Sequence, residues 1–178
     1  MDRRSKRTKH AIKQAFLDLT KEKPINKITI AELSQQADIG RGTFYTHYED
    51  IYDLRSKIIE ESICTLTDIF DQTYPNKEQY DFRRFVHTLV NHVDENKAVF
   101  HFFFNDFMDD ELSVQLTQIL IKRVMDEEQL DMKDVKNKVE ILFSISGTTS
   151  VLTEWINGNL NVEKEELIAI LDDIITRF

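Results

Sequence analysis

The chain has 178 residues, enough for one or two compact domains, and it carries a net charge of −9. It contains only 4 Gly and 2 Pro, so helices can run through most of it, and the single Cys64 excludes an internal disulfide. No apolar run is long enough to cross a bilayer, and residues 1–10 lack the apolar segment of a secretion signal, so we expect a cytoplasmic protein without a membrane partner.

The charge is distributed unevenly along the chain. Residues 1–57 contain 12 Lys and Arg against 8 Asp and Glu, a net charge of +4, whereas residues 58–178 contain 11 against 24, a net charge of −13. Phosphates would be attracted to the first part and repelled by the second. This split predicts a nucleic-acid-binding end attached to an acidic body.

The first predicted helix is preceded by a basic segment, DRRSKRTKH, at residues 2–10. The segment is consistent with a solvated tail, and equally with an arm or first helical turn that lies along the DNA backbone through Arg3 and Arg4. The helix that follows has apolar residues on one face and ends before Pro24.

Residues 29–48, TIAELSQQADIGRGTFYTHY, predict two short helices joined by a tight turn. Thr29 and Glu32 have the spacing of a capping box, in which each side chain satisfies a free backbone N–H of the other residue. Asp38 follows the first of these helices and tolerates left-handed turn geometry. The segment therefore predicts a helix-turn-helix.

The second helix of this motif divides into an inner and an outer side. Phe44 and Tyr48 lie four residues apart and would hold the helix against the core. The residues left around the rest of the helix are hydrogen-bond donors, a guanidinium and a phenol, namely Arg41, Thr43, Tyr45, Thr46 and His47. Such an outer side is typical of a recognition helix in the major groove of DNA.

This segment resembles the DNA-binding signature of the TetR family of transcriptional regulators. The resemblance rests on an ordered set of positions, which are Thr29, Ala37, Ile39, Gly42, Thr43, Phe44, Tyr45, His47, Tyr48 and Leu54. It covers the first third of the chain. The sequence departs from the family at Asp38, where Gly is frequent, and at Ile51, where a phosphate-binding Lys is frequent.

The predicted DNA contacts combine the chemistry of these residues with the resemblance. Arg41 can bind guanine O6 and N7 through both arms of its guanidinium, and Gly42 lets the backbone approach the groove. The resemblance implies backbone contacts for Thr29, Thr43, Tyr45 and His47, and base-facing positions for Arg41, Gly42 and Tyr45. The complete predicted set is Thr29, Arg41, Gly42, Thr43, Tyr45, Thr46, His47, Arg3 and Arg4.

The second half of the chain predicts a helical body. A long helix over residues 51–73, begun by Asp50, would lead from a first domain at residues 1–50 into a second at residues 51–178. The aromatic run at residues 99–108 must be enclosed by neighbours or line a cavity. The resemblance implies an effector pocket, with candidate lining residues Cys64, Phe100, His101, Phe103, Phe104, Phe107 and Trp155, and ordinary core packing is the alternative for each.

A helix over residues 135–157 is apolar on two sides, and Gly158 ends it as a C-cap. Val135, Val139, Leu142, Phe143 and Ser146 form one side, and Ile141, Ile145, Thr148, Leu152 and Ile156 form the other. The last helix also carries more apolar surface than one packed face requires. The alternatives are that it completes its own domain or that it joins a dimer interface, which would comprise Ile145, Thr148, Leu152, Leu167, Ile170, Leu171, Ile174 and Ile175.

The sequence therefore predicts an all-α protein with an N-terminal three-helix helix-turn-helix DNA-binding domain and a C-terminal helical ligand-binding and dimerisation domain, with about nine helices in all. We expect a homodimer that binds a palindromic operator in double-stranded DNA, and a repressor released by a small-molecule effector or a partner protein. The alternative is a helical protein-interaction module or co-activator with weak DNA binding. No cofactor or metal site is expected, since His87 and His92 do not share a helix face, and no nucleophile–base spacing suggests an enzyme.

Overall fold

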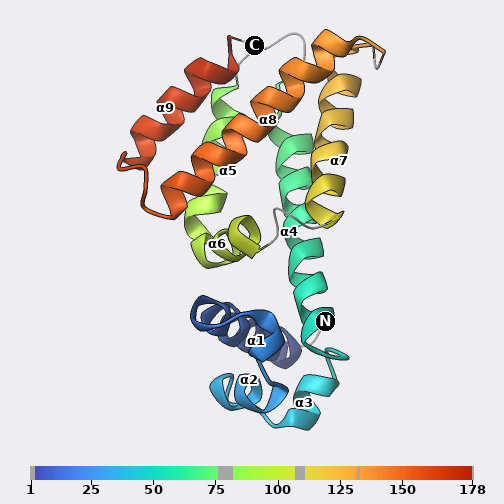
Figure 1. The fold of residues 1–178 in the computed structure, drawn as a ribbon, viewed down its shortest axis with the longest axis vertical. Coiled ribbons are helices and arrows are strands. Elements are labelled where there is room, and N and C mark those ends of the chain that lie inside the picture. Colours follow the sequence, from blue (N-terminus) through green and yellow to red (C-terminus); the bar gives the residue numbers. More distant parts are fainter. Residues whose placement is uncertain (1–2, 76–81, 107–110, 132, 178) are drawn as a thin grey trace. The chain divides into compact units, whose positions relative to one another are not determined.

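A computed structural model describes residues 3–75, 82–106, 111–131 and 133–177, and these residues contain helices and no strand (Figure 1). The helices are α1 (Arg3–Glu22), the 3-10 helix η1 (Ile25–Lys27), α2 (Ile30–Gln36), α3 (Arg41–Tyr45), α4 (Ile51–Thr73), α5 (Arg83–Glu95), α6 (Lys97–Asp106), α7 (Glu111–Glu127), α8 (Val135–Ile156) and α9 (Lys164–Ile175). The all-α prediction is confirmed. No described helix has the length and apolar character needed to span a membrane.

The chain forms two compact units, residues 1–62 and 63–178. The division lies inside α4, further along the chain than the predicted end of the first domain at residue 50. The first part of α4 belongs to the first unit because its Leu54 and Ile58 are buried. An ion pair between Lys13 Nζ and Glu61 Oε2, 3.3 Å apart, also ties α1 to α4 within this unit.

The core of the first unit is built from all four of its α-helices. Phe16 of α1, Leu33 of α2, Phe44 of α3 and Leu54 of α4 have no exposed surface. Burial of large apolar side chains stabilises each helix by about 1.5–3 kcal/mol per side chain. Because α2 and α3 are too short to be stable alone, this shared core is what keeps them folded.

One polar group in this core has no partner. The hydroxyl of Ser34 in α2 is buried and makes no hydrogen bond within the described part of the chain. A buried hydroxyl without a partner costs about 1–3 kcal/mol. Ser34 is therefore a local source of instability on the inner side of the helix-turn-helix.

The start of α4 is fixed by two carboxylates, as the predicted cap at Asp50 requires. Asp50 Oδ1 accepts a hydrogen bond from Asp53 N at 2.8 Å, and Asp53 Oδ2 accepts one from Glu49 N at 2.9 Å. The Nζ atom of Lys57 lies 2.7 Å from Asp53 Oδ2. The hydrogen bond from Lys57, followed by the one from Glu49, lowers the pKa of the Asp53 carboxyl.

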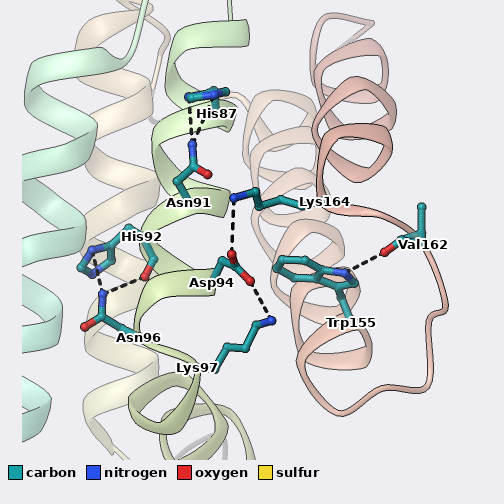
Figure 2. Close-up of polar contacts among 9 residues, drawn as sticks. All are labelled: His87, Asn91, His92, Asp94, Asn96, Lys97, Trp155, Val162 and Lys164. Atoms are coloured by element: carbon teal, nitrogen blue, oxygen red, sulfur yellow. Dashed lines mark hydrogen bonds and ion pairs between the residues drawn. The ribbon is translucent and has the colours of Figure 1, made fainter.

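The second unit contains the rest of α4 and the helices that follow it, with α5 against α9 and α8 against both α6 and α7 (Figure 1). Figure 2 shows Asp94 of α5 between two lysines, with Lys97 Nζ at 2.7 Å and Lys164 Nζ at 3.4 Å from its carboxylate oxygens. The Lys97 hydrogen bond is the main reason that the pKa of Asp94 is lowered. These contacts connect α5 to the first turns of α6 and α9.

The connection between α8 and α9 is closed by Trp155 and Gly158. The indole Nε1 of Trp155 donates to the carbonyl of Val162 at 3.0 Å (Figure 2). Gly158 has a φ of +74°, and Asn159 N donates to the Glu154 carbonyl at 2.9 Å. The predicted C-cap at Gly158 is confirmed, since this backbone geometry favours glycine.

Candidate functional site

The first helix of the helix-turn-helix is held at its start by Thr29. The hydroxyl of Thr29 accepts a hydrogen bond from Glu32 N at 3.3 Å, which confirms one half of the predicted capping box. The carboxylate of Glu32 pairs with Lys23, and that hydrogen bond is the main reason that its pKa is lowered. Glu32 thus ties α2 to the end of α1 in addition to its place in the first turn of α2.

The turn between α2 and α3 is left-handed at Asp38, as predicted. Asp38 has a φ of +53°, its backbone N–H donates to the Gln35 carbonyl at 3.2 Å, and Ile39 N donates to the Ser34 carbonyl at 3.0 Å. These two bonds form a Schellman motif, in which glycine is the usual left-handed residue. The turn therefore has a normal hydrogen-bond pattern around an unfavourable residue type.

Helix α3 has a buried side and an exposed side. Phe44 has no exposed surface and Tyr48 is 6 % exposed, and their ring centroids lie 5.6 Å apart. On the opposite side, Tyr45 is 58 % exposed. The predicted contact residues Arg41, Gly42, Thr43, Tyr45 and Thr46 are all exposed, and His47 is half-buried.

The backbone of α3 is uncovered at Gly42. A methyl group placed at this residue would have no atom within 4 Å. The hydroxyl of Thr46 donates to the Gly42 carbonyl at 2.9 Å, so the lone pairs of the Thr46 hydroxyl oxygen remain available to an outside donor. Nothing in the chain's own packing requires the glycine, although glycine inside a helix costs about 1 kcal/mol relative to alanine.

The residues around α3 differ from the family pattern at the start of α4. Ile51 is 7 % exposed and packs in the core, so its side chain is unavailable to phosphate. A cation lies six residues further along, where Lys57 Nζ donates to the His47 carbonyl at 3.4 Å and lies 5.3 Å from the centre of the Tyr48 ring. Sequence reasoning missed Lys57, although its four-residue spacing from Asp53 indicated an ion pair.

The basic segment at the start of the chain is helical from Arg3 onward. Arg3 and Arg4 are exposed in the first turn of α1. Of the two interpretations of this segment, the structure is that of a first helical turn. Its cationic side chains therefore project from a defined helix in the same unit as α3.

The second unit contains a cavity of about 1020 Å³. Of the seven predicted lining residues, Phe100 and Phe103 border it. Cys64 and His101 are exposed, Trp155 closes the α8–α9 connection, and none of these three is among the residues that border the cavity. Phe107 and the side chain of Phe104 lie outside what the structure describes.

Other residues border the cavity that the sequence did not indicate. Phe70 and Tyr74 come from α4 and its end, Phe85 from α5, and Glu128 from the end of α7. They are distant in sequence, and no periodic pattern connects them. Only the packing of the helices brings them together.

The predicted dimer residues divide between the interior and the surface. Ile145, Thr148 and Ile175 border the cavity, and Leu152, Leu167 and Leu171 are buried within the single chain. The side of α8 that contains Ile145 and Leu152 therefore packs inward in the single chain, and the predicted interface stays a prediction. The exposed large apolar side chains of the two helices are Val135, Val139, Leu142, Phe143, Ile170 and Ile174.

Metal binding finds no support in the described residues. They contain no group of three or more His, Cys, Asp or Glu side chains arranged to hold a metal ion.

Comparison with known proteins agrees with this architecture. Residues 81–177 match the sequence model of a TetR C-terminal family, which is described as a transcriptional regulator C-terminal region. The chain is also similar to the uncharacterized HTH-type transcriptional regulator YxbF of Bacillus subtilis, with 26% identity over 172 residues, 88% of this chain and 41% of that protein.

Two further relatives extend the comparison. The HTH-type dhaKLM operon transcriptional activator DhaS of Lactococcus lactis is 25% identical over 124 residues, 68% of this chain and 63% of that protein. The chain thus covers less than two thirds of the length of either curated relative. The solved fatty acid degradation regulator FadR of Bacillus halodurans shares the fold, with a TM-score of 0.72, 12% identity, and coverage of 94% of this chain and 97% of that one.

Proposed function

Because this chain belongs to the TetR family of transcriptional regulators, we propose that it binds a specific operator in double-stranded DNA through the exposed side of α3. The observation that carries the proposal is the two-sided α3, with Phe44 buried and Arg41, Thr43 and Tyr45 exposed. The net charge of +4 on residues 1–57 favours the same end. Members of this family regulate transcription and are not enzymes.

Arg41 is the proposed reader of a base. Its guanidinium begins the exposed side of α3 and can bind guanine through two parallel hydrogen bonds. The operator would first be selected from genomic fragments by gel shift. Arg41→Ala should then weaken operator binding by about 1–3 kcal/mol, the range for a bidentate base contact.

A matched control is Arg84→Ala, which removes the same charge from an exposed position on α5. It should leave operator affinity within about twofold, because Arg84 belongs to the second unit and is not among the proposed DNA contacts, and an exposed charge without a direct contact is screened by salt. Equal losses for the two variants would contradict the assignment of Arg41. Failure to select any operator would instead favour the protein-interaction alternative.

Gly42 offers a test that separates folding from DNA binding. Gly42→Ala adds a methyl group to open space, so the chain should become more stable by up to about 1 kcal/mol. The same methyl group would prevent the close approach of α3 to the groove, and operator affinity should fall. Urea unfolding and gel shift on one preparation measure the two effects, and unchanged affinity would show that Gly42 does not face DNA.

We propose that the protein is a homodimer and that its interface uses the exposed apolar residues of α8 and α9. Val135 is 71 % exposed and Phe143 is 63 % exposed, values that favour a covering partner. Phe143→Glu should give a monomer in sedimentation velocity. Ile119→Glu on α7, where the side chain is 38 % exposed, is the control and should leave the dimer intact.

The cavity is the proposed effector site, and release from the operator is its proposed effect. An effector that binds one conformation more tightly would shift the dimer to a state whose recognition helices no longer match successive major grooves, about 34–36 Å apart. Activation is the second candidate, because the similar protein DhaS is named as an activator. A reporter gene downstream of the selected operator, assayed with and without this protein, distinguishes repression from activation.

A further inference from the structure

The polar lining of the cavity is concentrated at one end, where Tyr74 meets Glu128. The Tyr74 hydroxyl donates to Glu128 Oε1 at 3.3 Å. Burial and the nearby charge of Glu128 raise the pKa of the Tyr74 phenol, so the phenol remains a protonated donor at neutral pH. This hydrogen bond positions the Glu128 side chain at the cavity surface.

Glu128 is the lining charge that the described residues do not neutralise. The described residues bordering the cavity carry three charged side chains, and two of these have ion partners: Glu140 with Lys136 at 3.5 Å, and Arg177 with Asp173. Arg123, on the same helix that leads to Glu128, pairs with Asp71. Within the described part of the chain, no lysine or arginine forms an ion pair with Glu128, so this end of the cavity is negative.

Two helix ends add to this negative potential. Tyr74 directly follows α4, which ends at Thr73, and Glu128 directly follows α7, which ends at Glu127. The hydrogen bond between Tyr74 and Glu128 places the two carboxyl-terminal helix ends together. Each helix end carries the equivalent of about half a negative charge and favours a cation.

Aromatic rings border the same end of the cavity. Tyr74 stacks on Phe70 with ring centroids 4.2 Å apart, and Phe85 meets both rings edge to face at 5.6 and 5.9 Å. Phe82 lies 5.4 Å from Tyr74. Aromatic faces attract organic cations, and more strongly when water is excluded.

We infer that the cavity takes an organic cation with an apolar body, an alkylammonium or arylammonium compound, whose charged group lies against Glu128. Its apolar part would lie along the phenylalanines, in a volume of about 1020 Å³ that exceeds the upper range of ordinary small-molecule pockets. The nearby cations Lys122 and Lys138 line a separate hollow of about 310 Å³ and are exposed to solvent. This inference rests on the proposed role of the cavity as an effector site.

Three ligands of equal chain length test the preference for charge. Decyltrimethylammonium, decanol and decanoate would each be titrated into the full chain by calorimetry, below their micelle concentrations. We expect decyltrimethylammonium to bind at least about tenfold more tightly than decanol, and decanoate to bind more weakly than decanol. Equal or tighter binding of decanol or decanoate, or no binding of any of the three, would overturn the inference.

Substitutions at Glu128 test whether this residue causes the preference for a cationic ligand. Glu128→Gln retains an acceptor for Tyr74 but removes the charge, so it should weaken decyltrimethylammonium binding by about tenfold and leave decanol within about twofold. Glu154→Gln, on the exposed side of α8, is the control and should change neither ligand. Glu128→Lys should reverse the preference in favour of decanoate. If Glu128→Gln left ammonium binding unchanged, the assignment of this residue would be wrong.

A gel shift separates this inference from the proposed function. If decyltrimethylammonium binds in the cavity but operator affinity does not change, the ligand class stands and the effector role fails. If decanoate is the ligand that releases the operator, the effector role stands and the ligand class fails.

Discussion

The two units of this protein use their cores differently. In the first unit, four α-helices meet around side chains with no exposed surface, and the residues proposed to contact DNA lie on the outside of that closed core. The second unit leaves a cavity of about 1020 Å³ among its helices. A closed core presents a fixed surface, whereas a core with a cavity can change its packing when a ligand fills it.

The largest expected difference in stability is between alanine substitutions at two phenylalanines, one in each unit. Phe44→Ala removes a fully buried ring from the closed core and should destabilise the first unit by about 3–5 kcal/mol. Phe103 is also buried, but its ring borders the cavity, so we expect Phe103→Ala to remove less packing and to cost less. Urea unfolding followed by amide hydrogen exchange in each unit measures both, and equal costs would contradict the contrast between the cores.

A smaller effect is expected at alkaline pH. Burial, followed by the charges of Glu61 and Asp53, raises the pKa of Tyr48 to about 12. The unfolded phenol titrates near pH 10, so the stabilising contribution of the neutral ring is complete below pH about 10 and is lost as pH rises through about 12. The first unit should lose roughly 2–3 kcal/mol over this interval, since one pKa unit corresponds to about 1.4 kcal/mol.

Tyr48→Phe is the control for that titration. The variant has no phenol at this position. The unfolding free energy of its first unit, measured by denaturation at increasing pH, should therefore depend less on pH between about 10 and 12, while that of the second unit should be unchanged by the substitution. An unchanged slope in the variant would assign the alkaline instability to other groups.

The smallest expected effects concern the two left-handed helix ends. Asp38→Gly should stabilise the first unit by about 0.5–1 kcal/mol, because glycine adopts a φ of +53° without a steric penalty. Gly158→Ala should destabilise the second unit by about 1–2 kcal/mol, because alanine is strained at a φ of +74°. A steric clash is not the reason, since the added methyl group has no atom within 4 Å. Thermal unfolding of the two variants should therefore shift in opposite directions.

Features that depend on neighbours in sequence were predictable. The cap at Thr29, the turn at Asp38, the start of α4 at Asp50 and the C-cap at Gly158 all follow from residue types within one or two helical turns. The buried and exposed sides of α3 followed from the four-residue spacing of Phe44 and Tyr48.

Features that depend on distant neighbours were not predictable. Both sides of α8 are apolar, so the sequence could not decide whether Ile145 or Phe143 faces the interior. The cavity residues Tyr74 and Glu128 meet only because the ends of α4 and α7 meet. The hydrogen bond from the Trp155 indole to the Val162 carbonyl likewise depends on the fold of the α8–α9 connection.

The unpaired hydroxyl of Ser34 has a practical consequence. It lies in the core of the first unit, so removing it by Ser34→Ala leaves every outward-facing atom of α3 in place. A Ser34→Ala background would therefore give a sturdier starting protein in which damaging changes at the DNA surface are tolerated without unfolding. Libraries that retarget this protein to new operators would retain more folded members in that background.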